Sequence, residues 1–535
     1  MDFLALAINY LILMSLGISL ETLFSGFYIA DRYFKFSDTG HYAHSEFELD
    51  IFDFIIVGAG SAGCVLANRL SARNYKVLLL EAGGNPFPLT LVPGLATKLL
   101  RNPNIDYGFM SAPQKHSFQS HKNNSYMIHR GKGLGGSSLL NFNMYMRGSP
   151  LDFEEWANMT GDDSWRYENV LKFFKKIENY QGYFPLDDVH GTDGPLHVES
   201  PVFFPMRDEW LQAGMEMGLR VKDPNGFQTE SVFPVDTSTL RGTRVSTYRA
   251  YLHPVLGRRN LKVITYAQAQ KIIFNDKNKV VAVSYSHDGK IHQVYIRDGT
   301  GPYSSTGSEV GALFSSSLAS RTDWPAIYLT YWPYGVSKVF AIDQENLYLT
   351  RSGLLTKYMA ADIGSDGFIV FIVLAKPKSF GELTLASANP NEHPIIDPNF
   401  LSHPDDIKVL LEGIQKSLKM TTQTNAFKKI GARLTNSSFP GCEKFVHLSA
   451  EYWDCYARNF CNSMYHPSGT CRMGRSSGDP GAVVDSQLRV LGTTGLRVID
   501  ASIMPQFLSH NKYITGTYYT AKLFSPAKYQ LLLLE

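Results

Sequence analysis

The fold is decided by Phe52–Leu70, which reads FDFIIVGAGSAGCVLANRL. This stretch opens with a short run rich in β-branched and aromatic side chains, which indicates a buried parallel strand. The run stops at a glycine-rich turn, residues 58–63, after which apolar residues recur at helical spacing. A second strand follows at Lys76–Leu80 and is closed by Glu81-Ala82-Gly83-Gly84. The sequence therefore predicts one complete βαβ unit.

The glycines of this unit have the G-x-G-x-x-G spacing of dinucleotide-binding proteins. Gly58 permits the tight turn, Gly60 lets a pyrophosphate approach the backbone, and Gly63 lets the helix pack on the strand. The helix N-terminus offers N–H donors to phosphates, and Glu81 is placed to accept hydrogen bonds from ribose hydroxyls. The alternative is a structural turn without a ligand, but the strand before, the helix after and the acidic residue favour a dinucleotide. The fingerprint alone does not separate FAD from NAD.

Composition excludes several classes of protein. The 535 residues include 51 Lys+Arg and 49 Asp+Glu, a net charge of +2, so no basic surface is expected for a nucleic-acid partner. The chain is 44% apolar and 13% aromatic, which predicts a folded rather than a disordered protein.

Further elements follow along the chain. We expect an amphipathic helix over residues 165–179 and strands from 261 to 297, with His287-Asp288-Gly289 as a hairpin turn. Apolar strands are also expected at 327–334 and 368–375. Pro404 opens a helix whose first turn carries two aspartates, where the helix dipole favours acids.

A second glycine cluster, Arg130-Gly131-Lys132-Gly133-Leu134-Gly135-Gly136-Ser137-Ser138, is followed by Asn141. Its small residues give a backbone that can lie against a flat or anionic ligand. The alternative is a flexible surface loop, which the apolar and aromatic residues up to Met146 disfavour.

A third cluster, residues 465–474, reads YHPSGTCRMG. His466 is open to three interpretations from the residues alone. It could be structural, a metal ligand with Cys461 and Cys471, or the partner of a nucleophilic cysteine, but no recognised ligand or nucleophile spacing supports the last two.

The chain has five cysteines, too few for a disulfide scaffold. Four of them lie between residues 442 and 471, so one or two local disulfides are expected in an oxidising compartment. Cys64 lies in the apolar pattern of the first helix and is expected to be a free thiol.

The N-terminus carries an apolar segment, Phe3–Leu20, with Gly17 and Ser19 as small residues near a cleavage site. A secretory signal is one interpretation. An uncleaved membrane anchor is the other, because about 20 apolar residues can span a bilayer. Three Asn-x-Ser/Thr sequons, at Asn123, Asn158 and Asn436, add little to this choice.

Together the clusters resemble the glucose–methanol–choline (GMC) oxidoreductases, and most of all their insect glucose-dehydrogenase-like branch. The resemblance runs from about residue 50 to 525. The matching stretches, in chain order, are DFIIVGAGSAGCVLANRL (53–70), VLLLEAGG (77–84), RGKGLGGSSLLNFNMYMRG (130–148), YHPSGTCRMG (465–474) and LRVIDASIMP (496–505).

The resemblance implies an α/β fold. It consists of a doubly wound, Rossmann-like FAD-binding domain and a substrate domain of antiparallel sheet and helices. The expected divisions are residues 1–49 as leader and linker, 50–297 as the N-terminal flavin-binding region, 298–374 as a substrate-domain segment and 375–535 as the C-terminal region.

The resemblance also implies an FAD-dependent alcohol dehydrogenase acting on the CH–OH group of a sugar- or polyol-type alcohol. In such an enzyme His466 would take the hydroxyl proton while hydride passes to flavin N5, and Asn511 would hold the substrate oxygen. No metal is expected. The residues expected to hold FAD are Gly58, Gly60, Ser61, Ala62, Gly63, Glu81, Arg130, Gly135, Gly136, Ser137, Asn141, Ala269, Asp500 and Ala501.

Partners and compartment follow from the same resemblance. The expected partners are a small-molecule alcohol and an unknown electron acceptor. No nucleic acid is expected, and a membrane is expected only if the N-terminal segment stays uncleaved. Members of the insect branch are typically secreted, so an extracellular location is expected, and Cys442 and Cys455 look like a disulfide pair of that branch. The sequence does not distinguish a dehydrogenase from an oxidase.

Two departures from the family pattern stand out. Around Asn511 the chain reads SHNKYITG (509–516), so His510 is an alternative to Asn511 in the site. After Arg297 the chain passes directly to Asp298-Gly299-Thr300-Gly301-Pro302 and omits several dozen residues, including a strand and the second family signature. This omission predicts weak FAD binding, and it keeps a non-catalytic or flavin-poor family member as the alternative function.

Overall fold

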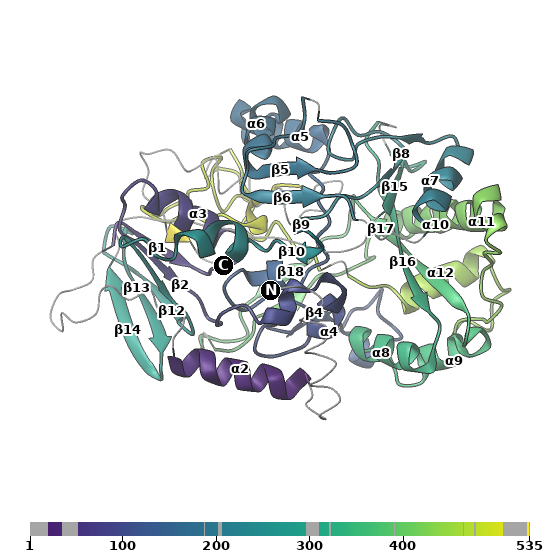
Figure 1. Cartoon of the computed structure of the whole chain (residues 1–535), viewed down its shortest axis with the longest axis horizontal. Helices are drawn as coiled ribbons and strands as arrows, with labels where there is room; N and C mark the ends of the chain where they lie inside the picture. Colours follow the sequence, from purple (N-terminus) through teal and green to yellow (C-terminus); the bar gives the residue numbers. More distant parts are fainter. Residues whose placement is uncertain are drawn as a thin grey trace.

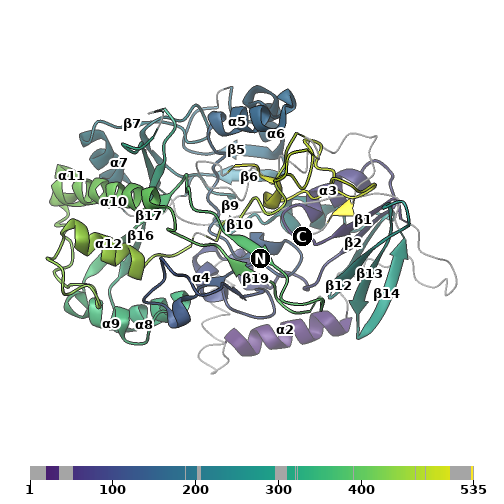
Figure 2. The same ribbon diagram turned by 180° about the vertical axis from the view of Figure 1, so that it is seen from behind.

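The structure is a computed structural model. It describes residues 20–34, 52–186, 188–201, 206–295, 310–319, 321, 323–389, 391–463, 465–475, 478–506 and 532–533. Figures 1 and 2 show a small parallel sheet and the ribbon β12–β14 at one end of the long axis, and the strands β15–β17 with helices α7–α12 at the other.

The parallel sheet has the strand order β11-β2-β1-β20. Its strands are β1 (Phe54–Val57), β2 (Val77–Leu80), β11 (Leu261–Ile264) and β20 (Leu532–Leu533). All neighbouring strands run parallel, and both strands of the predicted βαβ unit lie at its centre. The first two strands are buried along their whole length, as parallel strands covered on both faces must be.

A different element packs on each face of this parallel sheet. Ile56 and Leu79 belong to the core that packs under helix α3 (Gly63–Ser71). Ile55, Leu78 and their alternate neighbours pack against an antiparallel ribbon on the opposite face. The strands of that ribbon are β12 (Gln268–Phe274), β13 (Val280–His287) and β14 (Lys290–Tyr295). The predicted α/β class is confirmed, as is the hairpin turn between β13 and β14.

The outer edge of β1 differs from expectation. The family resemblance places Ala501 where the last strand enters the terminal helix, but residues 496–500, just before it, form no named strand and make one isolated antiparallel bridge, Arg489↔Arg497. The edge of β1 is instead taken by β20, with Ile55 opposite Leu532 and Ile56 opposite Leu533. A strand persists only where a neighbour satisfies its backbone groups, and the segment omitted after Arg297 is expected to supply one strand of the sheet.

The second sheet has the order β17-β16-β15-β8-β7. Only β7 and β8 are parallel; the other pairs are antiparallel. The strands are β7 (Arg220–Val221), β8 (Ser231–Pro234), β15 (Val310–Phe314), β16 (Ile327–Gly335) and β17 (Asp366–Leu374). Helices α7 (Arg207–Glu216), α10 (Pro404–Leu418) and α11 (Asn425–Lys429) add side chains to the core around this sheet. The strands at 327–334 and 368–375 and the helix at Pro404 are thereby confirmed.

Further helices and short strands accompany the two sheets. Helix α6 (Tyr167–Ile177) buries Val170, Phe174 and Ile177 on one face, as its spacing predicts. The other helices are α4 (Ala96–Leu99), α5 (Pro150–Thr160), α8 (Lys338–Tyr348), α9 (Leu354–Tyr358) and α12 (Ala450–Asn459). The short strands are β3 (Phe109–Met110), β4 (Met127–Ile128), β5 (Glu178–Gln181), β6 (Leu196–Glu199), β9 (Thr239–Leu240), β10 (Thr243–Arg244), β18 (Glu382–Thr384) and β19 (Ile395–Asp397).

The region expected to be leader and linker contains a helix, α2 (Leu20–Phe34). Apolar residues recur in its sequence at positions 20, 23, 24, 27 and 28, the spacing of one helical face. Figures 1 and 2 show α2 along one side of the molecule, beside β12. The rest of the apolar N-terminal segment lies outside the described residues. No helix in the described part of the chain combines the length and apolar character that a membrane span requires.

The cysteines behave as expected. Cys442 and Cys455 form a disulfide, which confirms the pair implied by the family resemblance. Cys64 is a free thiol, fully buried under the parallel sheet, and Cys461 and Cys471 are also free.

Candidate functional site

A large cavity of about 2150 Å³ brings the second and third sequence clusters together. Its wall includes Arg130, Ser137 and Asn141 from the second cluster and His466 from the third. The lining also includes β17 and the segment that follows it, residues 366–374 and 376–383. Small-ligand pockets measure roughly 300–1,000 Å³, so this cavity has room for a large cofactor together with a substrate.

The first glycine turn has the features of a phosphate site. No side chain caps the N-terminus of α3, so its first N–H groups are left for a ligand. The hydroxyl of Ser61 is buried there without a hydrogen-bond partner among the described residues. A Cβ on Gly63 would collide with the carbonyl oxygen of Gly58, so only glycine allows this packing. These observations fit the diphosphate of a dinucleotide.

The second glycine cluster packs directly against the first. The N–H of Gly135 donates to the carbonyl oxygen of Ala59 at 2.8 Å. A Cβ on Gly136 would lie 2.5 Å from the Cα of Gly60, so the two backbones touch. The two loops therefore form one surface at the carboxyl ends of β1 and β2, which is where open parallel sheets bind their ligands.

Glu81 joins the loops of this surface. Its carboxylate accepts hydrogen bonds from the N–H groups of Ala59 (2.7 Å), Gly83 (2.8 Å) and Gly133 (2.9 Å). The side chain is 5% exposed, and burial raises its pKa although the three N–H groups act in the opposite direction. The sequence predicts a ribose contact for Glu81; in the structure most of its acceptor capacity serves the backbone.

Asn141 is oriented by a residue that the sequence analysis does not identify. The guanidinium of Arg244 donates to the carbonyl oxygen of Asn141 at 2.7 Å and to its Oδ1 at 3.1 Å. Arg244 also donates to the carbonyl oxygen of Thr90 at 2.6 Å. Burial lowers the pKa of Arg244 to about 9. No local motif marks this arginine, because its partners lie far away in the sequence.

The third cluster is held beside residues 501–503. The N–H groups of Gly469, Cys471 and Met473 donate in turn to the carbonyl oxygens of Ala501, Ser502 and Ile503. Asp500 caps this short turn by accepting from the N–H of Ser502 at 2.7 Å. Burial raises the pKa of Asp500. This ladder presents His466, which is half-buried, at the cavity wall.

Arg130 ties the second cluster to the third. Its guanidinium donates to the carbonyl oxygen of Tyr465 at 2.8 Å, next to His466. Its N–H donates to Asp106, whose carboxylate also pairs with His129 at 2.6 Å. Burial opposes ionisation of Asp106, yet the hydrogen bond and charge of His129 lower its pKa. A fixed cation thus lies beside the histidine at the cavity.

Most of the predicted site residues therefore fall into three groups. Arg130, Ser137, Asn141 and His466 line the cavity. The residues at the stacked glycine turns are Gly58, Gly60, Ser61, Ala62, Gly63, Glu81, Gly135 and Gly136. Asp500 and Ala501 support the His466 segment, and Ala269 lies in β12, partly buried against the core of the parallel sheet. Asn511 and His510 lie outside the described residues.

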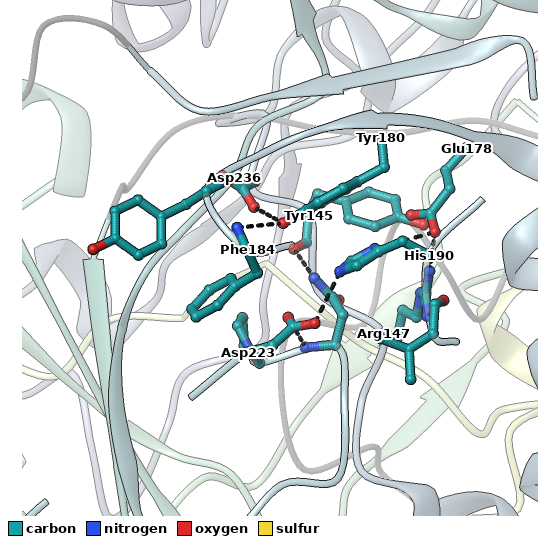
Figure 3. Close-up of polar contacts among 12 residues, drawn as sticks. Tyr145, Arg147, Glu178, Tyr180, Phe184, His190, Asp223 and Asp236 are labelled. Carbon is teal, nitrogen blue, oxygen red and sulfur yellow. Dashed lines mark hydrogen bonds and ion pairs between the residues drawn. The ribbon is translucent and has the colours of Figure 1, made fainter. Parts of the chain in front are cut away.

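A second polar cluster lies outside the cavity lining (Figure 3). Arg147 and Glu178 form a fully buried ion pair. His190 bridges Glu178 at 3.3 Å and Asp223 at 2.8 Å, and its ring stacks on Tyr180 with 3.4 Å between ring centroids. Because its carboxylates and cations compensate each other, this cluster is a structural anchor between β5 and the loops around it.

Comparison with known proteins agrees with these features. Two family models described as GMC oxidoreductase match residues 52–308 and 377–520. The chain is 33% identical to an alcohol dehydrogenase (acceptor) of Pseudomonas putida, covering 86% of this chain and 93% of the relative. It is 32% identical to the glucose dehydrogenase (FAD, quinone) of Drosophila melanogaster, covering 86% and 84%.

Solved structures share the fold. Pyridoxine 4-oxidase from Mesorbium loti superposes with a TM-score of 0.74 at 24% identity, covering 89% of this chain and 98% of that one. Formate oxidase of Aspergillus oryzae, studied for its FAD modification, gives 0.73 at 19% identity, covering 90% and 98%. The identities and coverage of the sequence relatives, together with the two family models, establish that this chain belongs to the GMC oxidoreductase family.

Proposed function

We propose that the protein is an FAD-dependent oxidoreductase that oxidises the CH–OH group of a sugar- or polyol-type alcohol. The observation that carries the proposal is the cavity that joins His466 to the glycine loops through Arg130. Its relatives include enzymes named for alcohol, glucose and choline, which supports the substrate class.

In this proposal the stacked glycine turns hold the ADP half of FAD, with the N–H groups of α3 and the hydroxyl of Ser61 facing its phosphates. Arg130, Ser137 and Asn141 face its flavin half. When bound, FAD accepts the hydride of the carbinol carbon. The chain's own part is to hold the alcohol at the cavity and to take its hydroxyl proton.

His466 is the proposed base. An imidazole is half-protonated near neutral pH and is therefore a ready acceptor for a hydroxyl proton. With FAD bound as the hydride acceptor, transfer of the hydroxyl proton to His466 would leave the alcohol carbon as a carbonyl. Asn511 is proposed to hold the substrate oxygen, with His510 as the alternative.

The test is His466→Ala in a flavin-loaded sample, with glucose, ethanol and choline as substrates. The flavin spectrum should stay intact, while the rate of FAD reduction by the substrate should fall by at least about 10²-fold. Stopped-flow absorbance measures this half-reaction. His116→Ala is the control, because His116 is exposed and does not line the cavity.

An unchanged half-reaction in the His466 variant would remove it from the mechanism. Asn511→Ala should cost less than His466→Ala. If His510→Ala costs more than Asn511→Ala, His510 holds the substrate oxygen instead.

A second candidate function is a family member that keeps the scaffold with little or no flavin. The alignment with the alcohol dehydrogenase is 528 positions long, but only 86% of this 535-residue chain takes part in it. At several dozen aligned positions the relative therefore has a residue where this chain has a gap. The visible absorbance of the purified protein near the flavin band decides between the two candidates.

A further inference from the structure

Helix α2 packs beside the second glycine loop although it precedes the region that the family models match. Tyr28 is buried, and Phe27 meets Phe87 edge-to-face with 5.4 Å between ring centroids. The apolar cluster that contains Tyr28 also contains Leu139 and Leu140, which continue the second glycine loop. The helix is therefore part of the same packed unit as that loop.

Asp31 makes polar contacts from this helix to two loops. Its Oδ2 accepts from the N–H of Asn85 and from the hydroxyl of Tyr266, both at 2.9 Å. Its Oδ1 accepts from the side-chain amide of Asn85 at 2.5 Å. The residue is 1% exposed, and Arg32 beside it lies over the Tyr266 ring at 5.6 Å. One buried carboxylate thus joins two separate loops.

Both loops lie at the ligand-binding edge of the parallel sheet. Asn85 follows the turn after β2, and Tyr266 belongs to the turn after β11. The N–H of Tyr266 donates to the carbonyl oxygen of Gly83 at 2.9 Å. The acidic residue that ends the second strand marks the ribose side of a dinucleotide site. Asp31 therefore acts where the adenosine half of the cofactor would lie.

The close approach of α2 to the loop after β2 requires a glycine at position 84. A Cβ at this position would lie 2.5 Å from the Oδ2 of Asp31 and would also collide with the hydroxyl of Tyr266. The absence of a side chain is what allows Asp31 to reach the backbone of Asn85.

We propose that α2 is a brace for the adenosine end of the FAD site, with Asp31 as its positioning residue. The inference rests on the proposed flavin function. Asp31 holds the turns after β2 and β11 in one arrangement, so the protein meets the adenosine half with its loops already ordered, which lowers the entropic cost of binding.

The experiment measures the affinity of the flavin-free full chain for FAD, ADP and FMN in wild type and in Asp31→Asn. The side-chain amide of this variant would replace one carboxylate oxygen of Asp31 by an NH₂ group. Because both oxygens accept hydrogen bonds, this NH₂ group would face a donor of Asn85 or Tyr266 in either orientation. The Kd of FAD and of ADP should rise at least about fivefold, while the Kd of FMN, which lacks adenosine, should change less than about twofold.

Three further variants test the same contacts and provide a control. Tyr266→Phe removes one donor, and Gly84→Ala displaces Asp31 without altering it, so both should weaken ADP binding in the same direction. Ile29→Ala is the matched control on α2, because Ile29 is 72% exposed, and it should leave all three affinities unchanged.

Equal losses of FAD, ADP and FMN binding would indicate general damage and overturn the positioning role. Unchanged affinities in Asp31→Asn and Gly84→Ala would overturn the inference while leaving the flavin function in place. A wild-type chain that binds neither FAD nor ADP would overturn the proposed function and this inference together.

Discussion

His190 carries a charge that depends on its neighbours in the buried polar cluster of Figure 3. Burial alone would lower the pKa of His190, but its hydrogen bonds to Asp223 and Glu178 and their charges raise it to about 9. Burial alone would raise the pKa of the Glu178 carboxylate. The pKa is nevertheless lowered, because the charges of Arg147 and His190 face this carboxylate. His190 is therefore charged in the folded protein at neutral pH.

A pH dependence follows from this charge. The folded pKa lies above the ordinary value of 6.5, so the stabilisation from His190 is fully present below about pH 6.5 and is lost as pH rises through 9. The free energy of unfolding of wild type should exceed that of His190→Gln most at low pH. The difference should shrink by up to about 3 kcal/mol between pH 6 and 10.

Urea unfolding at a series of pH values measures this difference. Asp236, whose pKa burial raises to about 6, titrates at the lower edge of this window and is common to both proteins. The exposed His116→Gln variant should track wild type throughout. A gap between wild type and His190→Gln that stays constant from pH 6 to 10 would contradict the charged state of His190.

At the scale of elements, the edge of β1 is the weakest part of the nucleotide-binding sheet. Among the described residues β20 supplies two paired positions there, and 496–500 form no strand. A sheet with a short edge strand leaves backbone groups of its neighbour unpaired, which weakens the support of the loops at its end. The omission after Arg297 and this short edge together predict weak FAD binding.

Reinserting the family's segment between Arg297 and Pro302 should raise both flavin occupancy and thermal stability. The added segment would restore a strand of the sheet and its flavin contacts, and bound ligand stabilises the native state by mass action. Flavin absorbance per chain and the Tm with and without added FAD measure the two effects. An inserted Gly/Ser segment of equal length is the control and should give neither gain. Near-stoichiometric FAD in the chain as it stands would show that the omitted segment is dispensable.

The elements also show what the sequence can predict. β1, α3, β2 and α10 follow from local periodicity and turn residues, so their positions were predictable within a few residues. The strand at 496–500 was predicted wrongly because a strand depends on its neighbour as well as on its own sequence. Arg244 and Asp31 were missed because their partners, such as Asn141 and Tyr266, are far away in the chain.

For the whole molecule, we propose that the protein is secreted. The disulfide between Cys442 and Cys455 supports an oxidising compartment, because such bonds are rare in the cytosol. A cut just after the apolar segment would leave α2, which begins at Leu20, on the mature chain.

Expression in a eukaryotic secretory host tests this proposal. The protein should appear in the medium with a new N-terminus downstream of about Ser19, as read by N-terminal sequencing. Leu13→Arg, which interrupts the apolar run, should keep the chain inside the cell. Recovery in the membrane pellet with Met1 intact would instead support an uncleaved anchor.

The pairing of β20 with β1 also constrains the order in which the molecule is made. β1 is among the first strands to be synthesised, and its partner follows after almost the whole length of the 535-residue chain. Contacts so distant along the chain form slowly, because the intervening segment must be ordered first. The edge of β1 therefore stays open until residues 532–533 have been synthesised, and a nascent chain depends on protection from premature strand pairing until then.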